Sequence, residues 1–183
     1  MPTSRSNVIS GQNITEDEYG EFYGRYIKKS RGKNLFTRFD EGQKQVIDLL
    51  QSLDEEQAHF RYAEEKWTIK ELAGHMIDTE RIMAFRALTF ARGDTHPLPG
   101  FDQDAYVESA NFNSMQLDVL MDQYSEVRSS TRHLFSSFSD EMLMAKGSAS
   151  NSEFSVRALG FVIAGHEIHH LEIFRDKYLP GLV

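Results

Sequence analysis

Apolar residues recur at helical spacing in four long segments of the chain, and this periodicity is the feature that most constrains its fold. In an amphipathic helix, apolar side chains three and four residues apart share one face. The segments cover about residues 35–53, 68–92, 114–134 and 155–178, and the alternation typical of strands is nowhere sustained. We therefore predict an all-α protein, a four-helix bundle of the up-and-down type with one long crossover loop.

Residues that favour helix ends lie at the boundaries of these segments. Thr68 with Glu71 forms a capping box that opens the second segment. Asn113 or Ser114 is expected to cap the third, and Pro180 to stop the fourth. The boundaries agree with the periodicity.

The remaining residues are assigned to an arm, a short helix and a loop. Residues 1–14 are predicted to be a flexible N-terminal arm, and residues 15–183 a single helical bundle domain that includes a short helix at 16–29. The crossover loop at 93–113 holds Asp104 and Tyr106. Long ordered loops often carry function. These two side chains could close over a site, although packing of the loop itself is the simpler interpretation.

Composition excludes several classes of protein. The 183 residues are 40% hydrophobic and carry a formal charge of −8, with Lys and Arg scattered along the chain, which argues against a nucleic-acid partner. The absence of Cys excludes disulfides, thiolate ligands and a cysteine nucleophile. No secretory signal or membrane-spanning stretch is apparent. We expect a cytoplasmic protein without a membrane partner.

The run His-Glu-Ile-His-His at 166–170 indicates a metal site. In a helix, residues four apart face the same way, so His166 and His170 can bind one ion. The run also fits the zinc-protease pattern H-E-x-x-H, but Ile173 and Asp176 stand where the longer metzincin pattern has Gly and His. A third ligand must come from upstream.

His75 is the upstream histidine that lies on the apolar face of a well-marked helix. Three neutral imidazoles on a divalent ion leave open positions, as in catalytic rather than structural sites. The alternative is that His75, His166 and His170 are separate, satisfied buried histidines. His169, at the edge of the same face, could support a ligand or be partly exposed.

A family resemblance supports the metal interpretation. Residues 67–81 (WTIKELAGHMIDTER), then 86–88 (RAL) and 91–94 (ARGD), with the closing run at 166–170, resemble the DinB-like superfamily of metal-binding four-helix bundles, which includes bacillithiol S-transferases. The resemblance extends from about residue 23 to 178. It implies that His75, His166 and His170 bind nickel, zinc or a similar divalent ion, and that the protein is a homodimer.

The resemblance also implies a reaction on a small-molecule substrate. The metal would activate a low-molecular-weight thiol for transfer to an electrophile, or activate water for hydrolysis. Because the chain has no Cys, a cosubstrate would have to supply the sulfur nucleophile. A non-enzymatic metal-binding bundle is a further alternative.

Glu167 and Arg86 are weaker candidates for catalytic residues. Glu167 is next to a predicted ligand, but a salt bridge or support of an imidazole fits its position on the helix better than catalysis. Arg86 falls on the inward arc of its helix, where a lone charge is costly, so it should find a carboxylate or bind an anionic substrate. Asp78 and Glu80 are the nearest candidate partners in sequence.

Overall fold

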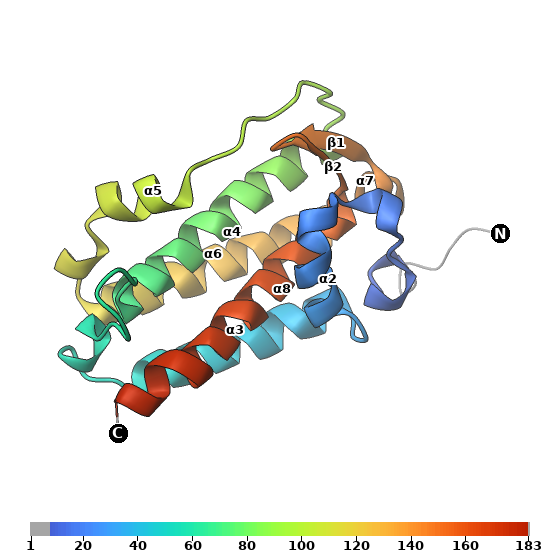
Figure 1. Ribbon diagram of the computed structural model, residues 1–183. Coiled ribbons are helices and arrows are strands. Elements are labelled where there is room, and N and C mark those ends of the chain that lie inside the picture. The colour runs from blue at the N-terminus through green and yellow to red at the C-terminus, as the bar shows by residue number, and fades with distance from the viewer. Residues whose placement is uncertain (1–7, 183) are drawn as a thin grey trace.

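The computed structural model describes residues 8–182, and its α-helices form a bundle with a short β-hairpin at one end (Figure 1). The four predicted segments are all helical, which confirms the fold class. The α-helices are α2 (Gly24–Ser30), α3 (Leu35–Gln51), α4 (Ile69–Ala91), α5 (Gln103–Ala110), α6 (Leu117–Ser137), α7 (Asp140–Met144) and α8 (Val156–Ile173), and the strands are β1 (Lys146–Ala149) and β2 (Ser152–Ser155).

The four long helices α3, α4, α6 and α8 are arranged around the bundle in an order that differs from their order in the chain. Helix α4 packs against α6 and α8, and α3 packs against the same two helices. Helices α3 and α4, although consecutive among the long helices, are therefore diagonal to each other. Within residues 8–182, no helix is long and apolar enough to cross a membrane.

Of the two predicted N-terminal caps, the structure confirms the first and contradicts the second. Thr68 and Glu71 form the reciprocal capping box of α4, and the Ser155 hydroxyl accepts from the Ala158 amide at 3.1 Å to cap α8. The cap predicted for the third long helix was wrong, because α6 begins at Leu117. Asn113 instead donates to Glu71 at 2.8 Å and accepts from Thr68 at 2.7 Å, which ties the crossover to the start of α4.

The crossover between α4 and α6 runs along the outside of α4 (Figure 1). It contains α5, which was predicted as loop, capped by the Asp102 carboxylate. The polar stretch after α7 forms the hairpin β1–β2, which the sequence analysis did not predict. Its turn residues Ser150 and Asn151 have φ of +52° and +58°, as a tight hairpin of type I′ requires.

The N-terminal region differs from its prediction. Of the arm at 1–14, residues 1–7 lie outside the described residues, whereas Val8, Ile9 and Ile14 are buried in the core. The predicted helix at 16–29 is two 3-10 turns followed by α2. Helix α2 packs along α8, where Gly165 allows the close approach: a Cβ there would lie 2.0 Å from the carbonyl oxygen of Tyr26.

A polar layer divides the bundle core into two apolar clusters. The cluster toward the hairpin includes Leu35, Phe39, Met83, Phe135 and Phe161. The cluster toward the C-terminus includes Val46, Leu72, Met76, Leu120 and Leu171. Between them, each long helix contributes small or polar residues: Gly42 from α3, Thr79 and Glu80 from α4, Arg128 from α6, and His166 and Glu167 from α8.

Candidate metal centre

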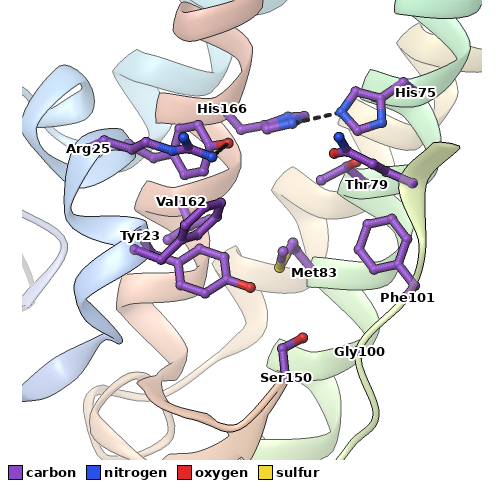
Figure 2. A pocket seen from close by; sticks show the side chains of 13 residues that line it. Tyr23, Arg25, His75, Thr79, Met83, Gly100, Phe101, Ser150, Val162 and His166 are labelled. Atoms are coloured by element: carbon purple, nitrogen blue, oxygen red, sulfur yellow. Dashed lines mark hydrogen bonds between the residues drawn. The ribbon is translucent and has the colours of Figure 1, made fainter.

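Helices α4 and α8 bring three imidazoles together in the polar layer. Nε2 of His166 lies 3.0 Å from Nε2 of His75 and 3.0 Å from Nε2 of His170. Figure 2 shows the contact between His75 and His166 from the side of a cavity. The side chains are 3%, 7% and 7% exposed for His75, His166 and His170, and a ligand nitrogen from each lies within 4.8 Å of the others.

These three histidines cannot satisfy one another by hydrogen bonding alone. An imidazole nitrogen carries either one proton or one lone pair in the ring plane, so Nε2 of His166 can complete only one of its two contacts. A cation can accept a lone pair from all three nitrogens. Nitrogens separated by 3.0 Å, as here, are close enough to bind one ion together. The arrangement fits a divalent metal ion.

Burial keeps the three imidazoles neutral. It lowers the pKa of His75 from 6.5 to about 4, with a small further contribution from His169. Burial lowers the pKa of His166 and His170 well below 6.5, and the neighbouring histidines act in the same direction. Neutral imidazole is the form that binds metals. The cluster is therefore ready to coordinate an ion at neutral pH.

Aromatic side chains surround the cluster. The Trp67 ring lies 4.7 Å from the His75 ring, between centroids, and Tyr26 on α2 makes edge contacts with His166 at 5.4 Å and His169 at 5.7 Å. Nδ1 of His170 is buried and has no hydrogen-bond partner among the described residues. His169 is partly exposed, as one of the two interpretations of this residue predicted.

Two cavities meet the histidine cluster. The first has a volume of about 340 Å³ and is lined by His75 and His166, and the second, of about 330 Å³, is lined by His170. Gln103, the first residue of α5, lines both cavities. The sequence analysis missed Gln103, although its neighbour Asp104, which lines the second cavity, was considered. Tyr106 is 47% exposed and packs on Phe101.

Glu167, the weak catalytic candidate, belongs to a separate buried network. Arg128 donates to both oxygens of Glu80, at 2.9 and 2.7 Å, and lies 2.7 Å from Oε2 of Glu167. The Tyr124 hydroxyl also donates to Glu167. The sequence analysis favoured a salt bridge for Glu167 but missed its partner, Arg128. Arg128 lies four residues after Tyr124, which faces the core, and this spacing could have shown that Arg128 also faces inward.

Arg86 has no carboxylate partner among residues 8–182, so the first of its two predicted partners, a carboxylate such as Asp78 or Glu80, is not found. Its Nη2 donates to the carbonyl oxygen of Pro99 and to the Ser150 hydroxyl, both at 2.9 Å. Burial lowers the pKa of this guanidinium, and interaction with Tyr23 partly opposes the shift. The residue is buried but paired only with neutral groups.

Comparison with known proteins identifies the family. A sequence profile described as the DinB superfamily matches residues 38–174. The chain belongs to the DinB superfamily. That span contains the three histidines and the four long helices, apart from the first three residues of α3. The match confirms the family resemblance inferred from the sequence motifs. No curated protein matched the sequence.

One solved structure extends the match over most of the fold. YfiT from Bacillus subtilis superimposes with a TM-score of 0.66 at 13% sequence identity, covering 92% of this chain and 97% of YfiT. YfiT is described as a probable metal-dependent hydrolase with an unusual four-helix bundle topology. At this identity the match concerns the fold alone. The homodimer, the identity of the metal and the cytoplasmic location stay predictions.

Proposed function

We propose that this DinB-superfamily protein is a metal-dependent enzyme that transfers a low-molecular-weight thiol to an electrophilic small molecule. The proposal rests on one observation: three neutral imidazoles converge, and between them they line two cavities of similar volume. His75, His166 and His170 would hold the ion, with nickel or zinc as the expected metals. A divalent cation held in this way would supply Lewis acidity and favour the deprotonated form of a thiol or of water.

Different side chains of the cluster line the two cavities. His75 and His166 face the first cavity, and His170 faces the second, so two molecules can approach the three nitrogens from different sides. The rings of Tyr26 and Trp67 contact His166 and His75, and these contacts would restrict water and hold the imidazoles in place. Gln103 can donate or accept hydrogen bonds in both cavities. Two binding spaces favour a reaction between two substrates.

Metal-dependent hydrolysis is the second candidate, and the description of YfiT favours it. In that case one substrate would extend across both cavities and water would be the nucleophile. The two candidates use the same three histidines, so they differ in their requirement for a thiol. A metal-binding bundle without turnover is the third possibility that the test must separate.

The test combines metal reconstitution with two assays. The untagged protein, loaded with nickel or zinc, is assayed with cysteine, glutathione, coenzyme A and bacillithiol against monobromobimane, and for hydrolysis of p-nitrophenyl acetate. We expect metal- and thiol-dependent turnover that falls to background in His166→Ala. Because His133 is exposed on α6, His133→Ala is the matched control and should retain activity. Hydrolysis without thiol dependence would favour the second candidate, and no turnover in either assay would contradict both.

A further inference from the structure

Arg86 differs from the other large buried cations in its partners. Arg128 pairs with Glu80 and Glu167, and Arg157 lies 2.5 Å from Glu18. Arg86 is 2% exposed, yet in the described part of the chain it contacts only groups without a formal negative charge: the Pro99 carbonyl, the Ser150 hydroxyl, the Met83 sulfur, the Phe101 ring and Tyr23. A buried charge without a counter-ion is costly. The local fold therefore leaves one positive charge uncompensated.

This charge lies behind the end of the first cavity that is remote from the histidines. Figure 2 shows His75 and His166 at one end of that cavity and Gly100 and Ser150 at the other. Arg86 donates to Ser150 and to the carbonyl of Pro99, next to Gly100. Because the Ser150 oxygen accepts this bond, its own O–H proton is free to point into the cavity.

The positions of His75 and Arg86 on α4 indicate how long the first cavity is and along which axis it runs. His75 and Arg86 are eleven residues apart on the same helix, which corresponds to about 16 Å along its axis. Thr79 lies between them and lines the cavity, and its hydroxyl is buried without a hydrogen-bond partner in the described structure. An elongated molecule can reach from the histidines past Thr79 to Ser150.

The charges around the two cavities also differ. No Asp or Glu lines the first cavity among the described residues, whereas Arg25 does, next to the exposed ring of Phe22. The second cavity is lined by Glu65 and Asp104 together with Lys66. The first cavity thus has a cation in its wall and another behind its far end, and it favours anions.

We propose that Ser150 and Arg86 form an anion-binding subsite, which holds a carboxylate or phosphate group of an elongated substrate whose other end reaches the histidine cluster. The Ser150 hydroxyl donates to the anion, and the guanidinium behind it supplies the opposite charge. This assignment of substrate class rests on the proposed function, because it places the reacting end of the molecule at the histidines. Binding at the subsite itself requires neither metal nor turnover.

The experiment therefore uses full-length protein that carries His166→Ala, so that no anion can bind a metal at the cluster. Isothermal titration compares hexanoate and hexyl phosphate with hexanol, which has the same chain length and no charge. We expect at least one of the anions to bind roughly 10- to 100-fold more tightly than hexanol, the range for hydrogen bonds to charged groups. The tighter anion identifies the group that the substrate carries. Equal binding of all three would overturn the proposal, whatever the outcome of the turnover assays.

Two further variants in this background test the residues. Arg86→Met should remove the preference for the anion, and Ser150→Gly, which suits a φ of +52°, should reduce it. Arg86→Met should also be at least as stable to urea as its parent, because it removes an unpaired buried charge. If Arg86→Met does not fold, Arg86→Lys takes its place and should lower the preference several-fold, because it keeps the charge but lacks the planar fork. A preference for anions that survives the change at Arg86 would overturn the proposal.

Discussion

Adjacent residues of α8 belong to two buried polar clusters with opposite properties. His166 joins the histidine cluster, in which nitrogens face one another and lack a positive partner. Glu167 joins a network in which Arg128 pairs with two carboxylates and Tyr124 adds a hydrogen bond. The network is completed by residues of the chain itself, so its role is to hold α4, α6 and α8 together. The histidine cluster has no such partner within the described residues and could hold a metal ion, which makes it the candidate functional site.

The largest expected effect is that of Arg128→Met on stability. The substitution leaves Glu80 and Glu167 buried without their counter-ion, and breaking a buried pair in this way costs about 3–5 kcal/mol. Urea unfolding followed by circular dichroism measures the loss. The matched control is Arg132→Met, one turn further along α6, where an exposed pair with Asp40 is lost at a cost of less than about 1 kcal/mol. Equal losses in the two variants would remove the distinction between a structural network and an ordinary surface pair.

A smaller loss of stability is expected for Gly42→Ala, which tests how closely α3 packs on the network. Alanine at an exposed helix position would stabilise α3 by up to about 1 kcal/mol. Here the new Cβ would lie 1.5 Å from Oε1 of Glu167, whose carboxylate is held by Arg128 and Tyr124. We expect a net destabilisation of about 1–3 kcal/mol in urea unfolding. A more stable variant would show that Glu167 moves freely.

The pH dependence of the metal-free protein tests the histidine cluster. The pKa of His75 is about 4 in the folded state and 6.5 in the unfolded state, so below pH 6.5 the unfolded chain binds more protons. The contribution of His75 to stability should therefore be constant above pH 7 and fall as the pH decreases from 6.5 toward 4. By pH 5.5 this histidine alone should account for a loss of stability on the order of 1 kcal/mol. The slope should be smaller in His75→Gln and unchanged in His133→Ala, as thermal unfolding across this range would show.

The features predicted correctly from the sequence are those that depend on local spacing. Helical periodicity identified the four long helices, and the four-residue spacing of His166 and His170 placed both on one face of α8. The inward position of His75 on α4 followed from the same periodicity. Each inference needs only the geometry of a single helix.

The features that were missed depend on contacts between distant segments. Arg128 meets Glu80 and Glu167 only because α6 packs against α4, and Gln103 reaches both cavities only because α5 folds back along the bundle. The hairpin strands have four residues each, which is too short for an alternating pattern to be distinguished from loop sequence. The periodicity of apolar residues shows which face of each helix is buried, but not which long helices lie diagonally opposite each other in the bundle.

Metal analysis of the untagged protein tests the central claim most directly. The protein, His166→Ala and the exposed-histidine control His133→Ala are loaded with nickel or zinc, freed of excess metal and measured by inductively coupled plasma mass spectrometry. The account predicts about one equivalent of metal in the parent protein and in His133→Ala, and none in His166→Ala, with helical circular dichroism retained in all three. A parent protein that holds no metal after reconstitution, or a His166→Ala variant that retains a full equivalent, would contradict it.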